Sequence, residues 1–143
     1  MVGAVNTIIG PRAPWLRAIT IGALTQVLLF GGYFGLAALN ASESVLFAGV
    51  VVASLLLYLA AGYLAGRSAR KSHALLGVVV GLAGVAVYFA YVAYLVSTGA
   101  MNATGTRPVT FSEALSLMNL ADHALKVLSA ALGAFLAGRK AAG

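Results

Sequence analysis

Residues 74–97 read ALLGVVVGLAGVAVYFAYVAYLVS, a stretch that contains no Asp, Glu, Lys or Arg. A helix needs about 20 consecutive, mostly apolar residues to cross the hydrocarbon core of a bilayer. Three further stretches of similar length and apolarity occur at approximately 18–39, 44–66 and 112–138. The sequence therefore predicts an all-α fold, a polytopic membrane protein with four transmembrane helices in an antiparallel bundle.

The amino-acid composition leads to the same interpretation. Hydrophobic residues make up 62% of the 143 residues and charged residues 8%, whereas a soluble domain carries roughly 25% charged residues. The chain has no cysteine, which excludes disulfides, thiolate metal sites and cysteine nucleophiles. We therefore expect the lipid bilayer to be the main partner of its surface, and we expect no metal and no cofactor.

The basic residues predict the orientation of the helices. Seven of the nine Lys and Arg residues flank the start of the first span or follow the second and fourth spans. By the positive-inside rule, both termini are then cytoplasmic. Basic helix ends of this kind meet anionic headgroups, so the net charge of +6 indicates no nucleic-acid partner. The Ala-, Gly-, Leu- and Val-rich composition is typical of prokaryotes, so we expect the inner (plasma) membrane.

The chain divides into a short lead-in and one domain. Residues 1–17 are expected to be interfacial or disordered, and residues 18–140 to form a single four-helix transmembrane domain. The end of the second span, GYLAGR, resembles the end of the fourth span, AFLAGR. This similarity is compatible with two hairpin repeats, 18–67 and 74–139. Small residues followed by Arg are also typical of any span that ends in the cytoplasm.

The start of the fourth span carries a helix-capping pattern. Thr110-Phe-Ser-Glu113 matches a capping box, in which the Glu side chain returns a hydrogen bond to the start of the helix. The pattern predicts one continuous helix from this point to the end of the span.

Four polar residues interrupt the apolar fourth span. At about 100° per residue, Asn119, Asp122, His123 and Lys126 fall on one face of the helix. A charge at the centre of a transmembrane helix costs roughly 2.5–3.5 kcal/mol, so this face is predicted to turn toward the protein interior. The i, i+4 spacing of Asp122 and Lys126 predicts an ion pair.

Other spans can contribute to the same polar cluster. Tyr88 and Tyr91 lie on one face of the third span at nearly the depth of Asp122, and Gln26 of the first span lies within about two turns of it. Their side chains are expected to satisfy the remaining hydrogen bonds of the ion pair. Two interpretations remain open, a polar latch or interfacial group and a working site for protons, ions or a polar ligand.

Small residues mark the faces on which helices are expected to pack, because they let two backbones approach closely in lipid. The candidate packing positions are Gly31, Gly35, Gly62, Gly66, Gly77, Gly81, Gly84 and Gly133. A chain of four helices cannot bury all of these positions internally. We therefore expect self-association or membership in a larger membrane complex.

Residues 60–84, AAGYLAGRSARKSHALLGVVVGLAG, carry a family resemblance. A helix that ends in Gly-aromatic-x-Ala-Gly-Arg is followed by a basic turn, a His and a Gly-rich helix. This arrangement resembles small prokaryotic four-helix integral membrane proteins of unknown function. The resemblance implies the fold and the topology and implies no activity.

The sequence contains no GxSxG, HExxH or phosphate-binding glycine loop, so we expect a protein that is not an enzyme. The first hypothesis is a membrane protein that acts by helix–helix assembly, as a homo-oligomer or an accessory subunit. The second is a small proton- or ion-coupled transporter or channel, in which Asp122 accepts the proton or cation and Lys126 tunes its pKa. A third, a holin-like or regulatory protein acting through its basic ends, is compatible with the sequence.

Overall fold

A computed structural model describes residues 13–69, 71, 73–102 and 105–143, and nearly all of them are helical. The elements are α2 (Ala13–Ala38), α3 (Glu43–Arg67), α4 (His73–Thr98), α5 (Phe111–Ala114) and α6 (Leu117–Ala142). Within these residues, α2, α3, α4 and α6 are each long and apolar enough to cross a membrane. The expectation of a helical protein with four such helices is confirmed.

The first helix begins earlier than the sequence predicted. Ala13–Arg17, which the prediction assigned to the lead-in, form the start of α2, and residues 1–12 lie outside the described residues. Pro14 fits here because the first turn of a helix leaves its backbone N–H groups unpaired. Trp15 is therefore held on a helix, with 37% of its surface exposed.

The predicted continuous helix over 112–138 is wrong at its start. The chain forms the single turn α5 and then restarts as α6, because Ser116 caps the second helix by accepting a bond from the Asn119 backbone N–H at 3.4 Å. Thr110 makes no side-chain capping bond within the described residues. Glu113, the expected partner in the capping box, instead forms an ion pair with Arg107 at 3.1 Å.

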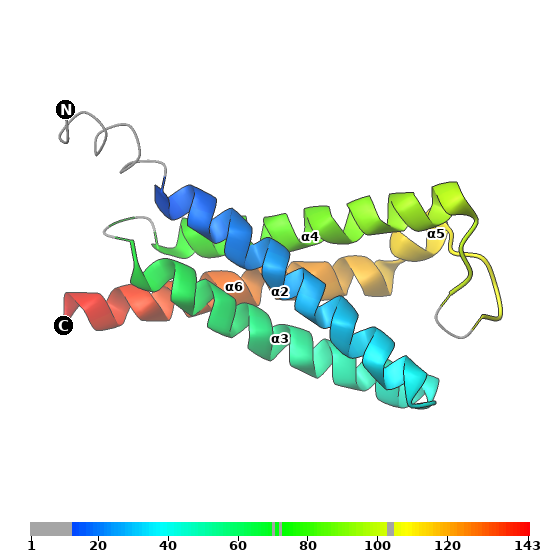
Figure 1. Cartoon of the computed structure of the whole chain (residues 1–143). Coiled ribbons are helices and arrows are strands. Elements are labelled where there is room, and N and C mark those ends of the chain that lie inside the picture. Colours follow the sequence, from blue (N-terminus) through cyan, green and yellow to red (C-terminus); the bar gives the residue numbers. More distant parts are fainter. Residues whose placement is uncertain (1–12, 70, 72, 103–104) are drawn as a thin grey trace.

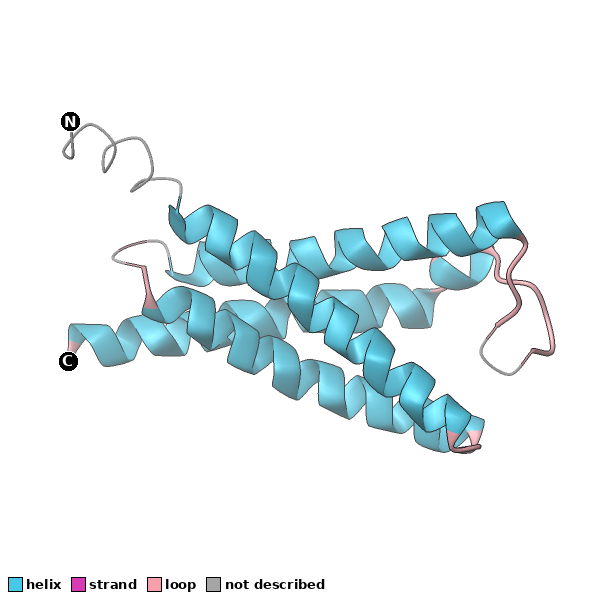
Figure 2. Ribbon diagram, viewed as in Figure 1, coloured by secondary structure: helices cyan, strands magenta, loops and turns pink. Residues whose placement is uncertain are grey.

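The long helices lie side by side, with α2 crossing the others (Figure 1). α6 packs against α3 and α4, and α2 packs against α4 and α3. The start of α2, the α3–α4 connection and the end of α6 lie at one end of the molecule, and the α2–α3 connection and α5 lie at the other. Figure 2 shows that the non-helical segments are confined to these two ends. Toward the second end, the α2–α3 pair diverges from α4 and α6.

Glycine contacts bring α6 close to its neighbours. A Cβ added to Gly66 of α3 would lie 2.7 Å from Ala134 Cα, and one added to Gly81 of α4 would lie 2.6 Å from Val127 Cα. Both distances are shorter than real Cβ contacts, so only glycine allows this approach. The positions at which an added Cβ would overlap the backbone of a neighbouring helix include Gly62, Gly66, Gly77, Gly81 and Gly133.

Gly31 and Gly35 do not pack within the chain. Both are exposed on α2, and no atom elsewhere in the described part of the chain lies within 4 Å of an added Cβ. Gly32 between them is equally open. This part of α2 therefore presents an open face of small residues to its surroundings, unlike the closely packed glycines Gly62, Gly66, Gly77, Gly81 and Gly133.

Candidate interior polar site

Asp122 and Lys126 form an ion pair on the inner face of α6. Lys126 Nζ lies 2.6 Å from Asp122 Oδ2, and the exposed fractions of the two side chains are 4% for Lys126 and 16% for Asp122. Consecutive turns of one helix bring the two groups together, as the i, i+4 spacing requires. Neither charge is left on the outer surface of the helices, and the pair is neutral as a unit.

His123 is packed beside the ion pair between aromatic rings. Its ring centroid lies 4.4 Å from that of Tyr88 and 5.5 Å from that of Phe89, and the residue is 5% exposed. Neither ring nitrogen has a hydrogen-bond partner among the described residues, and the same holds for Asp122 Oδ1. Three buried polar atoms are therefore left unsatisfied at one place, where buried polar atoms are ordinarily bonded.

Tyr88 and Tyr91 lie at the site, as predicted, and contact it with their rings and not with their hydroxyl groups. Lys126 Nζ lies 6.0 Å from the Tyr88 ring centroid, a cation–π distance. The Tyr91 ring packs against Phe30 of α2 with centroids 4.7 Å apart. Within the described residues, neither hydroxyl bonds to the ion pair. The prediction that the tyrosine hydroxyls complete the hydrogen bonds of Asp122 is therefore wrong.

Gln26 bonds to a residue that the sequence analysis did not select. Tyr58 of α3 is fully buried, and its hydroxyl donates to Gln26 Oε1 at 2.9 Å. An added Cβ on Gly84 of α4 would overlap the Tyr58 hydroxyl, so Gly84 makes the space in which this ring lies. The position could have been found, because Tyr58 lies four and eight residues before Gly62 and Gly66 and so shares their helix face.

Asn119 joins α6 to α5 and makes no bond to the ion pair. Its Nδ2 donates to the Glu113 backbone oxygen at 2.6 Å. The bond holds α5 close to the first turn of α6, while Glu113 itself reaches Arg107. The predicted cluster is thus divided, with Asn119 in a structural bond at the helix start and Asp122, His123 and Lys126 together one turn further along.

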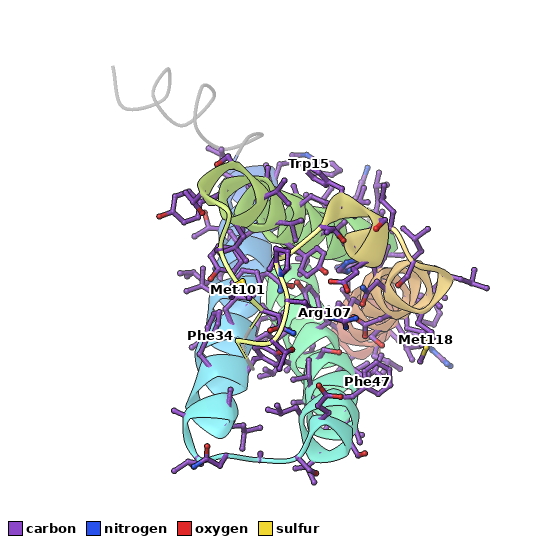
Figure 3. The ribbon with its side chains drawn as sticks, turned by 90° about the vertical axis from the view of Figure 1, so that its right-hand side faces the viewer. Trp15, Phe34, Phe47, Met101, Arg107 and Met118 are labelled. Carbon is purple, nitrogen blue, oxygen red and sulfur yellow. The ribbon has the colours of Figure 1, made fainter. Side chains whose placement is uncertain are left out.

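A cavity of about 360 Å³ lies against this cluster, in the angle where the α2–α3 pair diverges from α4 and α6. Its polar lining includes Gln26, Glu113, Asn119, Asp122, His123 and Lys126, and most of the remaining lining is aromatic or aliphatic. Figure 3 looks toward this end of the molecule, where Met101 and Arg107 lie between α2 and α6 while Met118 points outward. Met101 lines the cavity, as do Phe34 and Phe47.

Comparison with protein-family models, with curated proteins and with solved structures finds no match for this chain. The resemblance of residues 60–84 to small prokaryotic membrane proteins therefore stays a prediction.

Proposed function

We propose that this chain is a non-enzymatic protein of the prokaryotic plasma membrane and that its interior site takes up a proton together with a small solute, as in a proton-coupled transporter. Its four helices would run antiparallel with both termini in the cytoplasm. Support for this orientation comes from the basic residues at the start of α2, at the end of α3, between α3 and α4 and in the last turn of α6, which are Arg17, Arg67, Lys71 and Arg139.

The observation that carries the proposal is the incomplete bonding of the buried cluster beside a cavity. Asp122 Oδ1 and both ring nitrogens of His123 have no partner among the described residues. A polar group that serves only to join helices is most stabilising when all of its bonds are made, because an unsatisfied group in a low-dielectric interior is costly. Ionisable residues within membrane spans are candidates for proton and ion pathways for the same reason.

Proton flux into proteoliposomes tests this proposal. The purified protein is reconstituted around a trapped pH-sensitive dye, and a membrane potential is imposed. We expect the wild-type protein to increase the flux over empty liposomes and Asp122→Asn to abolish the increase. Glu43→Gln is the matched control, because Glu43 is exposed in the first turn of α3, away from the cavity lining. Wild-type flux equal to that of empty liposomes would remove the proposal.

A second candidate function, assembly with other membrane helices, is favoured by the open glycine face of α2. Gly31, Gly32 and Gly35 meet no other atoms of the described chain within 4 Å of an added Cβ. In lipid, helices associate through close packing at small residues. On this basis the chain would act as a homo-oligomer or as an accessory subunit that docks through α2.

The assembly candidate is tested by the size of the complex in lipid nanodiscs prepared directly from native membranes. Gly31→Leu is expected to reduce the complex to a single chain, because the added side chain would hold the helices apart. Val27→Leu is the matched control, since Val27 is 55% exposed one turn earlier on the same helix and is already a large residue. A wild-type protein that is monomeric and carries no partner would contradict this candidate.

A further inference from the structure

The walls of the cavity are suited to a flat ring. Its lining includes Phe30, Tyr33 and Phe34 from α2 and Tyr88 and Tyr91 from α4. Phe30 already packs against Tyr88 and Tyr91, with centroid distances of 6.3 and 4.7 Å. Aromatic side chains favour offset or edge-to-face contacts with further rings at such separations. An aromatic ligand would therefore find ring surfaces contributed by two helices.

Asp122 and His123 line the polar end of the cavity, and their unpaired atoms are buried at its wall. Their bonding capacity is suited to a hydroxyl group. Asp122 Oδ1 can only accept a hydrogen bond when the carboxylate is ionised in its pair with Lys126. A neutral His123 has one ring nitrogen that donates and one that accepts. A carbonyl or an ether oxygen could accept from His123 and would leave the carboxylate oxygen unsatisfied. A hydroxyl can donate to Asp122 and accept from His123.

The charges around the cavity are balanced. Asp122 is paired with Lys126 at 2.6 Å, and Glu113, the other carboxylate of the lining, is paired with Arg107 at 3.1 Å. Neither pair leaves a net charge to attract an ion. The volume of about 360 Å³ falls at the lower end of the range for small-molecule pockets, roughly 300–1,000 Å³. A neutral molecule of one or two fused rings is of a suitable size.

The lining also indicates how such a molecule could enter. Phe34 of α2 and Phe47 of α3 line the cavity and are 43% and 50% exposed, respectively. Both lie where the α2–α3 pair diverges from the other helices (Figure 3). Exposed apolar groups at this position face lipid in a membrane-spanning protein, so a lipid-soluble ligand would reach the cavity without crossing a charged surface.

We infer that the cavity binds a neutral, lipid-soluble aromatic molecule that bears a hydroxyl group. Its ring lies against the aromatic side chains that α2 and α4 contribute to the lining, and its hydroxyl bonds to Asp122 Oδ1 and His123 once these buried side chains turn toward the cavity. This molecule would be the solute of the interior site in the proposed function. The inference rests on that proposed function only in placing the solute beside Asp122. The binding requires no proton movement.

The test compares β-naphthol with its methyl ether, which has the same rings and no O–H donor. Binding to the full-length protein in nanodiscs is measured by equilibrium dialysis, with empty nanodiscs used to subtract partition into lipid. A hydrogen bond to a charged group predicts at least about tenfold tighter binding of β-naphthol than of the ether. Binding of neither compound above partition, or equal binding of both, would overturn the inference.

Substitution of His123 locates the binding. His123→Phe keeps a ring against Tyr88 and removes both nitrogens, so β-naphthol binding is expected to fall about tenfold. His73→Phe is the matched control, because His73 lies at the start of α4 and bonds to the Gly66 oxygen. A second variant, Asp122→Leu with Lys126→Met, removes the hydroxyl acceptor without leaving an unpaired charge. Full β-naphthol affinity in both cavity variants would refute the assignment.

The outcomes of this test and of the flux assay are separable. β-Naphthol binding without proton flux would support the ligand class and remove the transport proposal. Proton flux that does not change with β-naphthol, in a protein that fails to bind it, would support transport and overturn the ligand class.

Discussion

Gly84→Ala is the substitution whose consequence follows most directly from the geometry. An added Cβ at this position would overlap the hydroxyl of Tyr58 and would lie 2.7 and 2.9 Å from two of its ring carbons. Tyr58 is fully buried, and its hydroxyl is bonded to Gln26 at 2.9 Å. The ring cannot move aside without leaving its bond, so the smallest possible side chain at position 84 disturbs three helices.

The expected loss of stability can be worked out from its parts. Overpacking a filled interior costs roughly 1–3 kcal/mol, and loss of a hydrogen bond costs about 0.5–1.5 kcal/mol. Replacing glycine by alanine within a helix returns roughly 0.5–1 kcal/mol. The net effect of Gly84→Ala is therefore a decrease of about 2 kcal/mol in the free energy of unfolding.

The assay is reversible unfolding in mixed micelles, followed by circular dichroism as the fraction of denaturing detergent rises. Gly31→Ala is the matched control, because the same change on α2 meets no atom of the described chain within 4 Å, and it should leave stability unchanged or slightly raised. In a double-mutant cycle, Tyr58→Phe should reduce the cost of Gly84→Ala, since the hydroxyl is the nearest atom. Equal stability of Gly84→Ala and wild type would refute the reasoning.

Three further outcomes can be measured by the same unfolding assay. Lys126→Met should cost roughly 3–5 kcal/mol by leaving a buried carboxylate unpaired, and adding Asp122→Leu should recover most of this loss. Ser116→Ala should cost about 1 kcal/mol, because Ser116 caps α6, and it should extend hydrogen exchange into the first turn of that helix. Arg107→Ala should change stability by less than about 1 kcal/mol, because its pair with Glu113 is exposed.

The helices could be predicted from the sequence because lipid imposes a length and a polarity on each of them. The break between α5 and α6 could not be predicted in the same way. Thr110 precedes Phe111 and Ser116 precedes Leu117, and either residue can cap a helix. The choice of Ser116 goes together with two local contacts of Glu113, an ion pair with Arg107 and a bond from Asn119 to its backbone oxygen, which helix periodicity does not predict.

The part of the candidate site that lies on a single helix, α6, could be predicted from the sequence, whereas the contacts between helices could not. The shared face of Asp122, His123 and Lys126 follows from helix geometry, and so does the pairing of the two charges. The hydrogen bonds between side chains of different helices depend on the crossing angles of the helices, which the spacing of residues along the sequence does not predict. Gln26 was expected at the ion pair and instead accepts a bond from Tyr58, since the two side chains meet where α2 crosses α3.

The hydrogen bonds that join the helices are made by other residues than the Asp122–Lys126 pair. Tyr58 joins α3 to α2 through Gln26, and His73 joins α4 to α3 by donating to the Gly66 oxygen. The bond between Asp122 and Lys126 lies entirely within α6. A group that fixes the register of two helices is expected to hydrogen-bond across them, whereas among the described residues this pair reaches α4 through the cation–π contact of Lys126 with Tyr88. The glycine contacts of α6 would hold the same helices together if the pair were replaced by apolar residues of equal size. Within the described residues, the two buried charges thus make no hydrogen bond to another helix, which favours a role for the pair in the adjoining cavity.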